Sequence, residues 1–254
     1  SFVSPKAIPQ LADSKAVTEA VLKKYPGLDL FALVPNLRGA QNAYELGLRK
    51  VCYVVSLSKS HNKANINRTH EQSFAELRNV LDNCPELKLT VDIATAFGCP
   101  FEGIPTVSSL VDLIGKVRDY GIRNFTLGDT IGVANPKQVR ETVKALTAAY
   151  PDCTFRPHFH DTRNNGIVNT ITAIECGITE VETTLGGLGG CPFAPGASGN
   201  TATEDLVWLL DRMGYETGVD FEKALAAAQY EHSLLVGNYS GHQINITKRS
   251  ACCG

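Results

Sequence analysis

Several features that mark other protein classes are missing from this sequence of 254 residues. It has no block rich in Lys or Arg, and its formal net charge is only -2. A nucleic-acid partner is therefore not expected. The apolar runs are too short to span a bilayer, and none resembles the apolar part of a secretory signal. The composition thus predicts a globular protein with no membrane partner.

A disulfide framework is also missing. The chain has eight cysteines, but their spacing follows no framework, and a chain of this length can bury a sufficient core without crosslinks. We therefore expect a reducing compartment. The cytoplasm is the predicted location, and the mitochondrial matrix remains the alternative.

No Gly-x-Gly-x-x-Gly motif follows an early predicted strand, so an open, doubly wound dinucleotide fold has little support. Instead, strand and helix patterns alternate along the chain, as in repeated βα units. A continuous apolar run predicts a strand at 28–34, and strand patterns predict others at 50–57, 87–96, 124–127, 154–160 and 180–185. Helical patterns with capping residues predict helices at 36–46, 69–81, 106–120, 136–150, 165–176, 203–213 and 221–235.

Polar residues of interest cluster just after the predicted strands, which is where the active site of a (β/α)₈ (TIM) barrel is built. We therefore predict an α/β fold of this kind, with residues 1–254 forming a single catalytic domain. Six predicted strands cannot close an eight-stranded barrel, and the first residues resemble the loop that follows a strand. The sequence therefore predicts a barrel that lacks its first two strands in this chain.

Two histidines mark the predicted site. His158 and His160 are one residue apart at a strand end, so both side chains point to the same side and can bind one cation. Asn200, in a Gly-Ala-Ser-Gly-Asn run, is the third candidate ligand, although this run can also cap a helix. Imidazole and oxygen ligands without a thiolate pair suit a divalent cation such as Mg²⁺ or Mn²⁺.

Three further residues are candidates for the chemistry. Asp129 follows a strand and can act as a base or orient a water molecule, or it can hold the loop before the next helix. Cys191 lies on a glycine-rich loop and is a candidate proton donor. Glu204 is either a catalytic carboxylate or a residue that supports the site by capping.

Several segments together resemble 3-hydroxy-3-methylglutaryl-CoA lyases, within the metal-dependent barrel lyases. They include Ser-Phe-Val-Ser-Pro-Lys at 1–6, Leu-Gly-Asp-Thr-Ile-Gly at 127–132 and His-Phe-His-Asp-Thr at 158–162. The most specific is Gly-Leu-Gly-Gly-Cys-Pro at 187–192, because condensing enzymes of the wider group share the His-x-His but not this cysteine loop.

The resemblance implies a retro-Claisen cleavage of an acyl-CoA substrate. It assigns His158, His160 and Asn200 to the divalent cation, and makes Cys191 the catalytic cysteine. It places Asp129 beside the substrate. Ser58, Asp92 and Asn238 are the expected substrate contacts, and a homodimer is the expected assembly.

The sequence also departs from the family pattern. The resemblance implies an opening strand with an Arg-Asp pair, in which the Asp is a metal ligand, and a Glu on the second strand. Both are expected before Ser1, so we expect the chain by itself to be inactive. Thr90 and Asp92 stand where the family pattern has Arg and Tyr, and Lys59 where it has an acidic residue.

These departures leave three alternatives open. One is a lyase for a related 3-hydroxyacyl-CoA such as citramalyl-CoA, and another is a catalytically inactive, truncated barrel. The third is a condensing synthase, against which the Cys191 loop argues.

Overall fold

The computed structural model describes residues 1–190 and 199–246. Its centre is a sheet of five parallel strands that are hydrogen-bonded in the order of the chain, β1 to β5. The strands are β1 (Phe31–Leu33), β2 (Lys50–Ser56), β3 (Lys88–Ala94), β4 (Asn124–Asp129) and β5 (Thr154–Phe159). The alternation of strands and helices predicted from the sequence is confirmed over this region.

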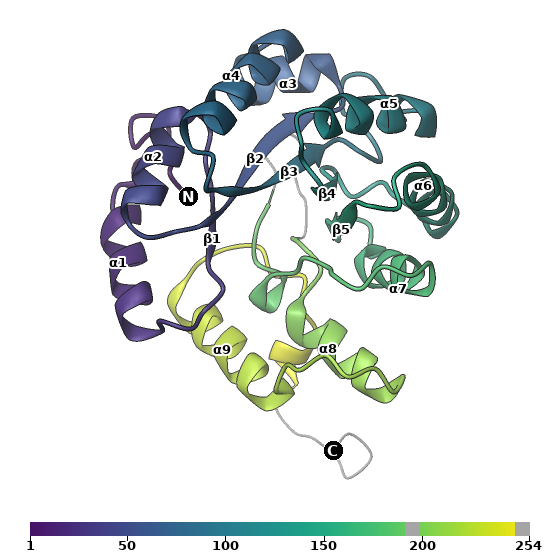
Figure 1. Ribbon diagram of the computed structural model, residues 1–254. Helices are drawn as coiled ribbons and strands as arrows, with labels where there is room; N and C mark the ends of the chain where they lie inside the picture. Colours follow the sequence, from purple (N-terminus) through teal and green to yellow (C-terminus); the bar gives the residue numbers. More distant parts are fainter. Residues whose placement is uncertain (191–198, 247–254) are drawn as a thin grey trace.

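The helices surround the strands and follow one another around the sheet, with α8 and α9 between α7 and α1 (Figure 1). They are α1 (Ser14–Lys24), α2 (Leu37–Glu45), α3 (Lys59–Ile66), α4 (His70–Asn83), α5 (Val107–Arg118), α6 (Pro136–Ala149), α7 (Gly166–Glu175), α8 (Thr203–Arg212) and α9 (Phe221–Leu234). Short 3₁₀ turns are η1 (Pro9–Leu11), η2 (Leu185–Gly187) and η3 (Gln243–Asn245).

The two faces of the sheet differ in polarity, as β3 illustrates. Leu89, Val91 and Ile93 are buried in the main core, which the sheet shares with residues of the surrounding helices. Thr90 and Asp92 point the other way because side chains alternate along a strand. Asp92 pairs in register with Thr126 of β4. We call this second face the inner face.

The predicted sixth strand at 180–185 is wrong as a continuous strand. This segment makes only isolated bridges, from Glu182 to His158 and from Thr184 to Ala202. The chain then turns into η2, where Gly186 and Gly187 have φ angles of +60° and +66°. Because such angles belong to the left-handed region, the extended backbone cannot continue.

Two helices were missed by the sequence patterns, α1 and α3. α1 buries only Thr18 and α3 is short and polar, so neither carries a strong apolar stripe. By contrast, the N-cap expected at Thr69 is confirmed. Thr69 Oγ1 accepts from Gln72 N, and Gln72 Oε1 accepts from Thr69 N, which forms a capping box.

The sheet has an open side. Within residues 1–190 and 199–246, β1 pairs with β2 alone. A cavity of about 1070 Å³ lies there, bordered by Phe31 and Lys50 on one side and by Glu180, Val207 and Leu210 on the other. In the described part of the chain, no helix is long and apolar enough to cross a membrane.

The capping box yields a stability prediction. Thr69→Ala removes the acceptor for the Gln72 N–H, so we expect the free energy of unfolding to fall by about 1 kcal/mol. Denaturant unfolding measures it. Thr69→Ser retains the oxygen and serves as the control. Equal stability of the Ala variant and the wild type would contradict a role for this cap.

Candidate functional site

The structure brings His158, His160 and Asn200 together. His158 is in β5, and His160 follows the strand and forms a backbone bridge with Asn200. The two imidazole rings have centroids 5.4 Å apart. His158 Nε2 lies 3.0 Å from Asn200 Oδ1. The three residues expected to group together therefore do so, although His158 and Asn200 are 42 positions apart in the chain.

Glu182 is a site residue that the sequence patterns missed. Its Oε2 lies 3.1 Å from His158 Nδ1, and its Oε1 accepts from the Thr126 hydroxyl at 2.8 Å. A carboxylate on the second ring nitrogen fixes the orientation of an imidazole and raises its basicity. The available signal was the strand predicted at 180–185, because Glu182 of this segment forms a bridge with His158.

The two imidazoles have different electrostatic environments. Burial lowers the pKa of His160 to about 4, and the charge of His158 adds to this effect. Burial also lowers the pKa of His158, but the hydrogen bond and charge of Glu182 raise it, and the net shift is upward. His160 is therefore a neutral imidazole with a lone pair at neutral pH.

These residues fit a divalent cation. His160 Nδ1 is buried without a hydrogen-bond partner among the described residues, and Asn200 supplies an amide oxygen. Over the same residues, no group of three or more His, Cys, Asp or Glu side chains forms a metal cluster. The remaining ligands would then be the Asp expected on the opening strand and oxygens of substrate or solvent, as is usual for Mg²⁺.

Asp92 lies on the inner face near this group. Burial raises the pKa of its carboxyl to about 7, and the charge of Glu182 adds to the rise. Asp92 Oδ1 is buried with no hydrogen-bond partner in the described part of the chain. A substrate contact at Asp92 stays a prediction.

Asp129 has a different environment. It pairs in register with Phe159, so it faces the helices and not His158. Its two carboxylate oxygens accept from Val133 N at 2.9 Å and from Ala134 N at 3.1 Å. Burial raises the pKa of this carboxyl to about 6, while these two bonds lower it. The geometry favours the loop-holding interpretation over direct catalysis.

Glu204 is fully buried at the start of α8. Its Oε2 accepts from Gly186 N at 3.0 Å, and burial raises the pKa of its carboxyl. This carboxylate therefore holds the glycine turn of η2, which agrees with the supporting role considered from the sequence.

Two of the expected substrate contacts lie outside this group. Ser58 is buried and caps α3, with its Oγ accepting from His61 N at 3.0 Å. Asn238 is exposed in the segment after α9, and its backbone carbonyl approaches Gly199. Cys191 lies outside the described residues.

Comparisons with known proteins show the family of this chain. The HMGL-like family model matches residues 7–230. Hydroxymethylglutaryl-CoA lyase YngG of Bacillus subtilis is 42% identical over 252 residues, which cover 98% of this chain and 84% of that protein. The mitochondrial hydroxymethylglutaryl-CoA lyase of Homo sapiens is 36% identical over 232 residues, which cover 91% of this chain and 71% of the human protein.

Solved structures agree as well. The HMG-CoA lyase of Bacillus subtilis superposes with a TM-score of 0.90 at 39% identity, covering 96% of this chain and 82% of that one. An HMG-CoA lyase of Acinetobacter baumannii, in complex with coenzyme A and 3-methylmalate, superposes with a TM-score of 0.91 at 36% identity. The superposition covers 98% of this chain and 82% of that one. The chain therefore belongs to the HMGL-like family, that of the hydroxymethylglutaryl-CoA lyases.

Proposed function

We propose that this protein cleaves 3-hydroxy-3-methylglutaryl-CoA to acetyl-CoA and acetoacetate. The observation that carries the proposal is the convergence of His158, His160 and Asn200 beside Glu182, in a chain of the HMGL-like family. Two imidazoles and an amide oxygen form a site for a divalent cation, for which Mg²⁺ and Mn²⁺ are the candidates.

A cation bound there would supply Lewis-acid polarisation of substrate oxygens. The residues of the chain supply the rest. Glu182 orients His158, and neutral His160 offers its lone pair. Asp129 positions the Val133–Ala134 backbone through its carboxylate, and Glu204 holds Gly186.

The reaction is a retro-Claisen cleavage. Removal of the proton from the tertiary hydroxyl of the substrate lets its oxygen form a carbonyl as the neighbouring C–C bond breaks. The electron pair passes to the acetyl-CoA enolate, which then takes a proton at carbon. We propose that Cys191 donates this proton, since a thiol can transfer protons to a carbanion.

Asp92 supports a second candidate substrate. Its buried carboxyl lies near Glu182 on the inner face, where the family resemblance implies a tyrosine. Because the residue at this position departs from the family pattern, a related 3-hydroxyacyl-CoA such as citramalyl-CoA is the alternative substrate.

We also propose that the domain is one (β/α)₈ barrel in which two more strands lie between the 180–184 segment and β1. The open edge of β1 and the 1070 Å³ cavity support this arrangement, as does the eight-stranded closure of such barrels. These are the strands that the resemblance expects before Ser1. Homodimer formation and the cytoplasmic location remain predictions.

The first prediction concerns turnover. A protein that includes the two additional strands should release acetyl-CoA from 3-hydroxy-3-methylglutaryl-CoA when Mg²⁺ or Mn²⁺ is added, in a coupled spectrophotometric assay. His158→Ala removes a metal ligand, and we expect kcat/KM to fall at least a hundredfold. Turnover that survives this substitution would refute the assignment of the site. Cleavage of citramalyl-CoA alone would favour the second substrate.

The second prediction concerns Glu182 and can be measured on the 254-residue chain. Glu182→Gln removes the charge that orients His158, so we expect the Kd for Mn²⁺ to rise about tenfold to a hundredfold by isothermal titration calorimetry. Glu45→Gln, at an exposed position of α2, is the matched control. An unchanged Kd in the Glu182 variant would show that this carboxylate does not support the site.

A further inference from the structure

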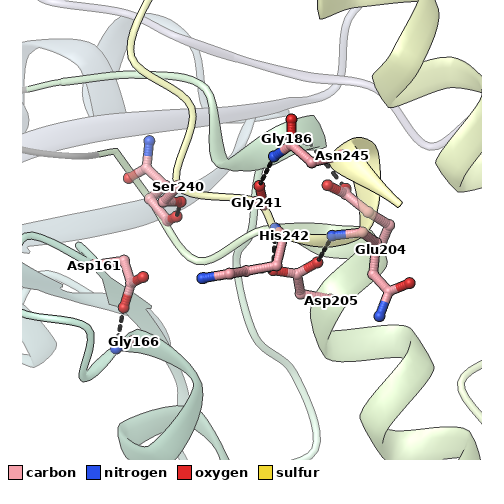
Figure 2. Close-up of polar contacts among 11 residues, drawn as sticks. Asp161, Gly166, Gly186, Glu204, Asp205, Ser240, Gly241, His242 and Asn245 are labelled. Carbon is pink, nitrogen blue, oxygen red and sulfur yellow. Dashed lines mark hydrogen bonds and ion pairs between the residues drawn. The ribbon is translucent and has the colours of Figure 1, made fainter. Parts of the chain in front are cut away.

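A segment far along the chain returns to the site after α9. Residues 239–245, here called the strap, lie against the turn of η2 and the first turn of α8 (Figure 2). Asp205, which is 8% exposed, binds the strap at several points. Its Oδ2 accepts from His242 N at 2.8 Å and lies 3.2 Å from His242 Nδ1, and its Oδ1 accepts from Gln243 N at 2.8 Å.

The strap also contacts Asn200 directly. The Ser240 hydroxyl donates to the backbone carbonyl of Asn200, the residue whose side chain faces His158. One residue later, Gly241 N donates to Gly186 O at 2.9 Å. Asn200 N in turn donates to Gly187 O at 2.9 Å. The strap, the η2 turn and Asn200 are therefore joined by direct hydrogen bonds.

The packing between these segments leaves no free space. A Cβ atom on Gly187 would collide with Ser240 Oγ, and one on Gly189 would collide with Asn200 Nδ2. A Cβ atom on Gly241 would lie 2.7 Å from Glu204 Oε1. Glycine is required at these positions because side-chain atoms of the neighbouring segments fill the space. Asn200 thus has little freedom to move independently of the strap.

We propose that the strap positions Asn200 for cation binding, with Ser240 and Asp205 as its positioning residues. Ser240 holds the Asn200 backbone, while Asp205 holds the strap from which Ser240 projects. Neither side chain contacts the cation. They act by keeping the amide oxygen beside His158, so that binding does not require Asn200 to be ordered first. The proposal rests on the cation site of the proposed function.

The test uses Ser240→Ala and Asp205→Asn in the 254-residue chain. Ser240→Ala removes the donor to Asn200, and Asp205→Asn replaces one of the two acceptor oxygens with an NH₂ group, which cannot accept from a backbone N–H. We expect each to raise the Kd for Mn²⁺ about tenfold. Amide hydrogen exchange in 199–202 should also accelerate. Ser240→Thr keeps the hydroxyl, so its Kd for Mn²⁺ and its exchange rates should match those of the wild type.

Asp211→Asn is the matched control, at an exposed position of α8, the helix that also carries Asp205. It should change neither the Kd for Mn²⁺ nor the exchange rates in 199–202. Unchanged exchange in 199–202 in both variants would overturn the proposal. So would faster exchange with an unchanged Kd, because the strap would then be only a structural anchor. If the wild-type chain binds no Mn²⁺, the titration is repeated on a protein that carries the two additional strands, and absence of binding there too makes both the cation site of the proposed function and the positioning role fail. The exchange data still show whether the strap holds Asn200.

Discussion

The site depends on the two contacts of the His158 ring. Glu182 binds one ring nitrogen and Asn200 approaches the other, at 3.1 and 3.0 Å. One partner precedes η2 and the other follows Gly199, so the imidazole joins two segments that each contact β5 or the residue just after it. A change in either segment alters the orientation of the ring, and with it the geometry available to a cation.

The acidic residues of this part of the molecule differ in the groups that they bind. Glu182 acts on the imidazole, whereas Asp129, Glu204 and Asp205 accept hydrogen bonds from backbone N–H groups of neighbouring loops. Each of these loop contacts immobilises a segment whose glycines would otherwise leave it free, at the cost of burying a carboxylate. Asp92 differs because one of its oxygens stays without a partner in the described part of the chain.

The sequence patterns predicted the elements better than their contacts. Five of the six expected strands form, and Thr69 caps α4 where its side chain suggested. The prediction for 180–185 failed because its β-branched residues are typical of a strand, while two left-handed glycines end the extended backbone. α3 was missed because its polar residues lack helical periodicity.

The sequence by itself determined that His158 and His160 share one side, because side chains alternate along a strand. It also determined the Thr69 cap of α4, which depends on two residues three positions apart. Only the tertiary structure decided that Glu182 is the partner of His158, that Asp129 faces a loop, and that residues 239–245 hold Asn200. These contacts join segments that are distant in the chain or depend on how a loop closes. Local sequence patterns therefore do not predict these contacts.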